Sequence, residues 1–348
     1  FIVPLFKFEY LVIYYMKRLL ILLALTSFIA SCQQKDFKVD ISNINVDIEI
    51  SRFEMDLFEI EMDSMAIGID MLKKKYGSFF DLYAQQVLRI GHPNSSMFSD
   101  NIKSFITDYN IYKSYEEVQV VYNSLNEIEH KLSTAFSYYK YYFPEKQVPA
   151  IYTIMTGFNQ SIVIDEGIIA VSLEKYLGKN CEFYDWLMVS NYLRINMHPG
   201  MIVSDCMKAW ALTEYEFNDS VNNLINNMIY NGKTHYFQRC MLPNEQDSII
   251  FGFTGKQIEW CKRNEENMWM YLIDNKLLYN NDFLMIRKFT EPSPFTKNFS
   301  NQSPGRAANW LGYKIVERYM NKNREVSLKE LMELNEYQVI LQKAKYRP

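Results

Sequence analysis

A block of β-type residues at positions 148–171 constrains the fold of this chain more than any other feature. It begins with two runs rich in Ile, Val, Tyr and Thr, at 148–156 and 161–165, and a third run starts at Ile168. Such residues favour strands, and Asp165-Glu166-Gly167 is typical of a tight turn. We therefore expect a small, mainly antiparallel sheet in this block.

Helical patterns lie on both sides of the block. Residues 115–142 place apolar side chains three and four positions apart, which predicts one long amphipathic helix. Its stripe contains Val118, Val121, Leu125, Ile128, Leu132, Phe136 and Tyr139. His130 lies off this stripe, so we expect it in solvent. The chain is helical again after residue 178, and a short strand is expected at 45–50.

These patterns predict an α+β, predominantly helical fold with a single globular domain at residues 45–348. We expect a helical part at 60–145 and a sheet-plus-helix part at 146–348. The stretch 51–58 is expected to lead the first strand into a turn.

Capping residues predict three helix starts in the C-terminal half. Thr254 with Gln257, and Ser327 with Glu330, have the spacing of a capping box. We expect the first helix to run to about residue 275 and the second to be the last in the chain. Ser303, followed by Pro304, predicts a third start. Residues 291–304 are expected to form a long loop, on the surface or in a cleft.

Residues 16–32 have the features of a bacterial lipoprotein signal. Lys17 and Arg18 precede a short apolar stretch, which ends in the lipobox Ile29-Ala30-Ser31-Cys32. The stretch is shorter than the roughly 20 residues that span a bilayer. We expect an upstream extension at 1–15, a signal peptide at 16–31, and a lipidated tether at 32–44 that begins at Cys32. The alternative is an ordinary signal peptide with a chance cysteine.

Composition and cysteine spacing exclude some classes of protein. The net charge of −4 and the lack of a basic stripe argue against a nucleic-acid partner. Beyond Cys32 there is no CxxC pair, so a zinc ribbon is not expected. We expect buried free thiols, although export permits disulfides and the spacing selects no pairing among Cys181, Cys206, Cys240 and Cys261.

No catalytic or metal-binding motif is present. A thermolysin-like zinc site needs two histidines four apart on one helix, with Glu after the first. The four histidines are His92, His130, His198 and His235, and none is followed by Glu or lies four from another. Asn231 and His235 share a helix face by their spacing. We interpret them as a hydrogen-bonded core pair rather than a catalytic pair.

The segment 303–320 has the features of a tightly packed helix. Gly312 lies within the helical pattern, where glycine costs about 1 kcal/mol relative to alanine, so a packing reason is expected. Small residues there let another backbone approach closely. The candidate cleft or packing residues are Asn231, Gly232, His235, Arg306, Trp310, Gly312 and Tyr313.

Four segments together resemble the gliding-motility lipoprotein B (GldB) family of Bacteroidetes. They are S-R-F-E-M-D-L-F, I-Y-T-I-M-T-G-F-N-Q-S-I-V-I-D-E-G-I-I-A-V-S-L-E-K-Y-L-G, M-I-Y-N-G-K-T-H-Y-F and S-P-G-R-A-A-N-W-L-G-Y-K-I-V-E-R-Y-M, and they cover roughly residues 52–320. The resemblance implies a cell-envelope lipoprotein needed for gliding, near the type IX secretion and motility machinery. It also implies distant kinship with gluzincin-type zinc peptidases. In that frame residues 201–210 would be the metal-binding helix but lack histidine, and Asn231 replaces an acidic ligand.

We therefore expect a non-catalytic, lipid-anchored protein of the cell envelope, at the outer membrane because Gln33 rather than Asp follows Cys32. Its expected partners are the membrane, through the lipid, and envelope motility or secretion proteins. No cofactor is expected besides the covalent lipid. The alternatives are an envelope hydrolase with an unrecognised site and a peptide- or glycan-binding lipoprotein. Three converging His, Asp or Glu side chains would favour the hydrolase, and an aromatic-lined cleft would favour the binding protein.

Overall fold

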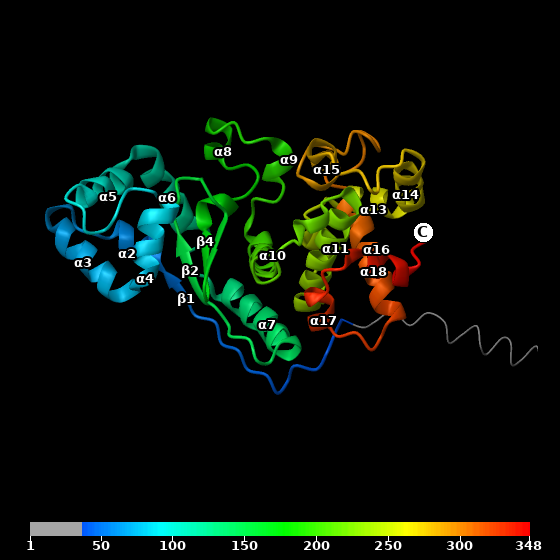
Figure 1. Cartoon of the computed structure of the whole chain (residues 1–348). Coiled ribbons are helices and arrows are strands. Elements are labelled where there is room, and N and C mark those ends of the chain that lie inside the picture. Colours follow the sequence, from blue (N-terminus) through cyan, green and yellow to red (C-terminus); the bar gives the residue numbers. More distant parts are fainter. Residues whose placement is uncertain (1–36) are drawn as a thin grey trace, which may run out of the picture. The chain divides into compact units, whose positions relative to one another are not determined.

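The sheet contains four strands and is mixed rather than mainly antiparallel. The computed structural model describes residues 37–348, which form one compact unit (Figure 1). Within it the strands lie in the order β1-β2-β4-β3, with bounds β1 Ile50–Arg52, β2 Ala150–Ile154, β3 Ile162–Asp165 and β4 Ile168–Ser172. The predicted turn at Glu166-Gly167 does join β3 to β4 as an antiparallel pair.

The other two strand pairs, β1–β2 and β2–β4, are parallel, so the expected antiparallel arrangement is wrong for them. Residues 155–161 carry the chain past the position of β4, and β4 then returns between β2 and β3. The strand predicted at 45–50 is short and begins only at Ile50.

The N-terminal helices surround an aromatic core centred on Phe53. The rings of Tyr76, Phe79, Phe80 and Tyr83 all lie within 6.2 Å of the Phe53 ring, centroid to centroid. The stretch expected to be a turn is helix α2, since its apolar face is buried in this core. The elements are α2 Phe53–Phe58, η1 Met62–Ser64, α3 Met65–Tyr76, α4 Ser78–Leu82, the π-helical turn η2 Tyr83–Val87, and α5 Phe98–Thr107.

The long helix predicted at 115–142 is two helices, α6 Tyr109–Val121 and α7 Asn126–Tyr142. The break follows Tyr122, whose carbonyl accepts a hydrogen bond from Arg52 Nη1 at 2.7 Å. That bond draws the carbonyl away from the helical ladder. The apolar spacing continues across the break because both helices face the same core, and His130 is exposed as expected.

The C-terminal half is helical, and α11 and α16 lie along each other at its centre (Figure 1). Its elements are η3 Leu173–Tyr176, α8 Glu182–Trp186, α9 Asn191–Arg194, η4 Pro199–Met201, α10 Ile202–Glu214, η5 Asp219–Val221, α11 Leu224–Met241, α12 Asp247–Phe251, α13 Gly255–Arg263, α14 Glu265–Asp274, α15 Phe283–Thr290, α16 Ala308–Lys322, α17 Leu328–Glu333 and α18 Tyr337–Ala344. Together these elements confirm the predominantly helical α+β fold.

Both predicted capping boxes are confirmed, at Thr254 and Ser327. The helix from Thr254 ends at Arg263 and α14 follows it, so the expected single helix to about 275 is wrong. The helix that starts after Ser327 is followed by α18, so it is not the last helix.

The start predicted at Ser303 is also wrong, because α16 begins at Ala308. Ser303 is buried in the preceding loop, where its hydroxyl donates to the Ser300 carbonyl at 2.6 Å. The N-cap of α16 is Ala307, and the Thr296 hydroxyl ties it to the loop by accepting a hydrogen bond from the Ala307 N–H at 3.0 Å.

The predicted extension, signal peptide and lipidated Cys32 lie outside the described residues. Residues 37–44 of the predicted tether are described, and they pack on the domain. The Phe37 ring lies 5.3 Å from the Tyr236 ring, and Val39 and Ile41 contact the core. From Phe37 onward the segment is therefore part of the globular unit, because its apolar side chains alternate toward the core.

Within residues 37–348, no helix combines the length and the apolar character needed to cross a bilayer. The described cysteines are free, as expected: Cys206, Cys240 and Cys261 are buried and Cys181 is half-buried.

Candidate functional site

Helices α11 and α16 touch backbone to backbone at Gly232 and Gly312. A Cβ on Gly232 would lie 2.3 Å from the Gly312 carbonyl oxygen, and a Cβ on Gly312 would lie 1.7 Å from the Met228 carbonyl oxygen. Neither distance is possible for a real side chain, so both positions require glycine. We refer to this contact of α11 with α16 as the glycine crossing.

The neighbouring Lys233 is a buried structural cation. Its ammonium donates to the Met332 carbonyl at 2.9 Å and to the Leu334 carbonyl at 2.7 Å, at the end of α17. The ammonium also lies 5.5 Å from the centre of the Tyr337 ring. Lys233 therefore joins α11 to the C-terminal helices and satisfies carbonyls that α17 leaves open.

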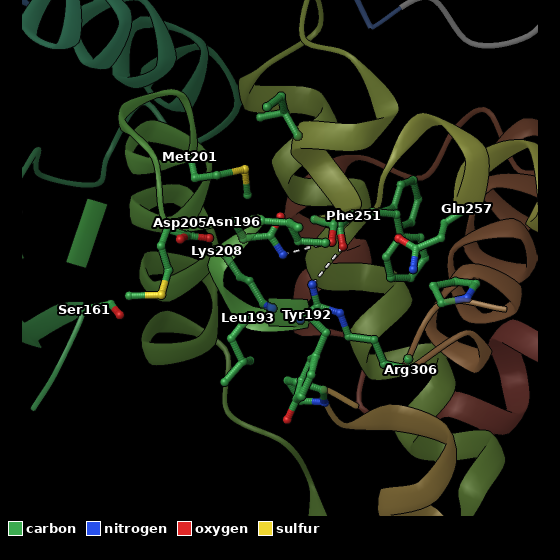
Figure 2. Close-up of a pocket in the computed structure, with 18 of the residues that line it drawn as sticks. Ser161, Tyr192, Leu193, Asn196, Met201, Asp205, Lys208, Phe251, Gln257 and Arg306 are labelled. Atoms are coloured by element: carbon green, nitrogen blue, oxygen red, sulfur yellow. Dashed lines mark hydrogen bonds between the residues drawn. The ribbon is translucent and has the colours of Figure 1, made fainter. Parts of the chain in front are cut away.

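A cavity of about 350 Å³ lies beside the glycine crossing. Its wall comes from α10, α11, the turn between α12 and α13, the segment around α9, and the loop before α16 (Figure 2). Among the residues proposed from sequence, His235 and Arg306 line it. The predicted loop at 291–304 contributes Pro292, Ser293, Pro294 and Pro304 to the same wall.

The other proposed residues lie elsewhere. Asn231 is half-buried, and its side-chain amide donates to the Asn227 carbonyl one turn back, at 2.9 Å. The expected hydrogen-bonded pair of Asn231 and His235 is therefore wrong: each side chain bonds its own neighbour. Trp310 and Tyr313 are buried and pack against the Phe251 ring, with centroids 4.9 Å and 5.1 Å away.

His235 is held neutral in the wall of the cavity. The Gln238 amide nitrogen donates to the Ser204 carbonyl at 3.0 Å, so the Gln238 oxygen faces His235 Nδ1 at 2.9 Å. Nδ1 therefore carries a proton and donates it. Burial lowers the pKa of His235 well below its usual range, and the nearby Lys208 and Arg306 add to this effect.

Arg306 is fixed by unusual backbone geometry. Its φ of +53° is a left-handed conformation that non-glycine residues rarely adopt. Its guanidinium donates to the Phe251 carbonyl at 2.9 Å and lies 5.7 Å from the centre of the Phe253 ring. Gly305 is forced, because a Cβ there would lie 2.0 Å from the Ser293 carbonyl oxygen. The loop and the turn after α12 thus aim Arg306 into the cavity.

Helix α10 adds two charged residues that sequence reasoning did not single out, Asp205 and Lys208. Asp205 accepts a hydrogen bond from the Tyr176 hydroxyl at 2.9 Å. Burial raises the pKa of Asp205, and Lys208, Tyr176 and Arg306 oppose that rise. Burial and the repulsion of Arg306 lower the pKa of Lys208 to about 8. Their spacing of three, which puts both charges on one face of a largely apolar helix, is the sequence signal that could have found them.

The donor set of the cavity does not resemble a metal centre. Among residues 37–348, no group of three or more His, Cys, Asp or Glu side chains is arranged to hold a metal ion. The wall offers one imidazole and one carboxylate, and Lys208 and Arg306 lie close enough to lower the pKa of that imidazole. Two cations beside the donors oppose the binding of a third.

Comparison with known proteins decides the family. The family model described as "Gliding motility protein GldB" matches residues 34–348. The chain belongs to this family. The match includes α10, α11 and α16, so the whole wall of the cavity lies in the family's domain. No curated protein and no solved structure matches the chain.

Proposed function

We propose that this protein is a lipid-anchored, non-catalytic binding protein of the gliding-motility and type IX secretion machinery. In this proposal it receives an extended segment of a partner protein in the cavity beside the glycine crossing. The observation that carries the proposal is the cavity itself, a ready-formed space of about 350 Å³ inside the domain that the motility family defines. That volume is in the range of cavities that bind small ligands.

The lining supports binding of a peptide. Tyr192, Leu193, Met197 and Phe253 give it an apolar and partly aromatic wall, and Asn196 and Gln257 offer polar groups. Such a mixture suits a chain that presents both side chains and amides. The aromatic residues are the feature that favours a peptide-binding lipoprotein over a hydrolase.

Kinship with gluzincin-type peptidases is part of this proposal. The segment 201–210, which the resemblance places where a metal-binding helix would stand, lines the cavity through Met201, Asp205 and Lys208. The absence of histidine from this segment, together with the cavity that it lines, supports loss of the metal with retention of the cleft. His235, whose Nδ1 proton is committed to Gln238, supports a structural role for that residue.

Membrane attachment is proposed to occur through a lipid on Cys32, and Gln33 favours the outer membrane. Several acyl chains, at about 0.8 kcal/mol per buried methylene, would make release slow. Cys32→Ser is expected to move the protein out of the membrane fraction. Unchanged membrane attachment of this variant would overturn the lipid anchor.

The binding role can be tested by blocking the cavity. Leu193 lines the cavity and is 39% exposed, so Leu193→Trp adds volume at the opening without entering the core. Leu187→Trp is the matched control, because Leu187 is 49% exposed and lies outside the cavity wall. Membrane-attached wild-type protein and the control should co-purify with motility or secretion proteins identified by mass spectrometry, and the blocked variant should lose them. Equal recovery by all three forms, or recovery of no such protein, would contradict the proposal.

A further inference from the structure

The cavity has an excess of positive charge on its inner wall. Lys208 from α10 and Arg306 from the loop before α16 point toward the same space, and Asp205 is the carboxylate beside them (Figure 2). We propose that Lys208 and Arg306 bind the terminal carboxylate of a peptide. This inference rests on the proposed function, because it names the chemical group by which the cavity would recognise the partner segment.

The ammonium of Lys208 lacks a bonded partner in the part of the chain that the structure describes. Among the residues that the structure describes, its ammonium makes no hydrogen bond and no ion pair within 4 Å, and Arg306 repels it. By contrast, the buried Arg239 donates to the Glu245 carbonyl at 2.5 Å and to Asp247 at 2.6 Å. Lys208 is half-buried, and a partly desolvated cation without a bonded partner is unfavourable, so it is expected where a ligand supplies an anion.

The geometry of Arg306 is the second argument. Its guanidinium has five N–H donors, and one of them is used in the hydrogen bond to the Phe251 carbonyl. A positive φ in a non-glycine residue costs about 1–3 kcal/mol, and such strain gathers at ligand-binding positions. The planar fork of arginine matches the two oxygens of a carboxylate. The backbone strain therefore holds Arg306 beside Lys208. In this position its guanidinium keeps N–H donors that the Phe251 carbonyl does not use.

The charge balance of the wall favours a singly charged anion. Lys208 and Arg306 face one carboxylate, Asp205, which leaves one positive charge uncompensated at this end. Lys175, also in the wall, donates to the Phe158 carbonyl at 3.1 Å and lies under the influence of Glu174 instead. His235 is neutral, as its lowered pKa requires. A carboxylate would neutralise the end of the cavity, whereas a doubly charged phosphate would leave a negative excess beside Asp205.

The apolar part of the wall identifies the source of the carboxylate. Leu193, Met197 and Met201 lie on the same cavity as the two cations. An apolar side chain next to a carboxylate is what the last residue of a peptide chain presents. Inorganic phosphate could share the cations but could not use this surface.

Binding to the full-length protein in detergent tests the inference. The probes are N-acetyl-Ala-Val-Leu with a free carboxylate, the same peptide as its C-terminal amide, and inorganic phosphate. Calorimetry should give the free acid at least a tenfold higher affinity than the amide. Lys208→Met should weaken the acid at least tenfold and leave the amide unchanged, while Lys208→Arg should retain most of the affinity.

Lys256→Met is the matched control for loss of charge, because Lys256 is exposed and adjacent to Gln257 of the wall. It should bind the acid as the wild type does. The inference is overturned if acid and amide bind equally, if Lys208→Met binds as the wild type does, or if phosphate binds more tightly than the acid.

These outcomes separate the inference from the proposed function. If Leu193→Trp loses its partner proteins while the free acid and the amide bind equally, the cavity binds a partner but does not recognise a terminal carboxylate. If the acid binds through Lys208 while Leu193→Trp keeps every partner, the carboxylate site stands and the proposed function fails.

Discussion

Two lysines of this protein have similarly lowered pKa values but different surroundings: Lys233 is buried and Lys208 is half-buried. Lys233 lies at the glycine crossing and Lys208 lies in the cavity, and burial lowers the pKa of each to about 8. The Lys233 ammonium donates hydrogen bonds to two carbonyls at the end of α17, whereas Lys208 has no hydrogen-bond acceptor within residues 37–348. The pKa alone therefore does not distinguish a structural cation from a binding one. The two kinds of cation differ instead in the number of hydrogen-bond acceptors around the ammonium.

The same contrast holds for the surrounding structure. At the crossing, two backbones touch and leave no room even for a methyl group. At the cavity, Arg306 with its positive φ and the half-buried Lys208 line a volume of about 350 Å³. The close packing of the first region stabilises the fold, whereas in our proposal the second region lowers stability until a ligand binds. Substitutions should therefore act in opposite directions in the two regions.

The largest effect is expected at the crossing. Gly312→Ala places a methyl group against the Met228 carbonyl, so α11 and α16 must separate and the free energy of unfolding should fall by about 3 kcal/mol or more. Gly255→Ala is the control, because a Cβ on Gly255 meets nothing within 4 Å. Denaturant unfolding followed by circular dichroism measures both. Equal stability of the two variants would show that the helices do not depend on the close contact.

Removal of the Lys233 ammonium should also lower the stability of the fold. Lys233→Met leaves the carbonyls of Met332 and Leu334 without their donor, and each buried unsatisfied group costs about 1–3 kcal/mol. Loss of the buried charge offsets part of this cost, so a net fall of about 1–2 kcal/mol is expected. A more stable Lys233→Met variant in the same unfolding assay would remove the distinction between the two lysines.

The same substitution at Lys208, Lys208→Met, should raise the free energy of unfolding instead of lowering it. Lys208→Met removes an unpaired cation and its repulsion from Arg306, so the unliganded protein should gain about 1–2 kcal/mol at pH 7. The apolar stem is kept, which limits any change in packing. A loss of stability of similar size would show that Lys208 has a structural partner.

The stability that Lys208→Met gains over the wild type should depend on pH. The folded state holds the Lys208 proton less tightly than the unfolded chain, because its pKa falls from 10.5 to about 8. The destabilisation is therefore complete below about pH 8, and stability recovers as pH rises toward 10.5. The charges that face Lys208 are Asp205 on its own helix and Arg306 on the loop before α16, with neutral His235 on α11.

Unfolding curves of wild type and Lys208→Met between pH 7 and about pH 10 measure this dependence. Comparing the two proteins cancels the titration of the tyrosines and cysteines. The difference in their stability should stay constant up to about pH 8 and then shrink as the pH rises further. A constant difference would mean that Lys208 has an ordinary pKa.

The smallest effect is expected at Asn231. Its amide bonds a carbonyl of its own helix and is half-buried, so Asn231→Ala should change stability by less than about 0.5 kcal/mol. Thermal unfolding can resolve a change of more than this size. A larger fall in the free energy of unfolding would show that the Asn231 side chain takes part in the interactions of the core.

The sequence predicted the features that depend on local pattern. Gly312 within a helical repeat predicted a close backbone contact, and Thr254 with Gln257 predicted a capping box, because each depends on residues a few positions apart. The parallel pairing of β1 with β2 was missed, since nothing near residue 50 specifies a partner at residue 151. The break after Tyr122 was missed for the same reason, because it depends on Arg52.

The candidate site was predicted only in part. His235 and Arg306 were proposed, but their common wall depends on how α10, α11 and the loop before α16 come together. Lys208 was missed because a lysine on a helix is usually solvated. The positive φ of Arg306 has no sequence signal of its own, since that conformation is imposed by the loop packed on Gly305.

The most direct test of the account is a titration of the two lysines by ¹³C NMR, with Lys208→Met and Lys233→Met used to assign the signals. In the free protein both should titrate near pH 8. Saturation with N-acetyl-Ala-Val-Leu should raise the pKa of Lys208 and leave that of Lys233 unchanged, because only Lys208 gains an anion. An ordinary pKa for Lys208 in the free protein, or a Lys208 pKa that the bound peptide does not change, would show that Lys208 is not a binding cation for a carboxylate.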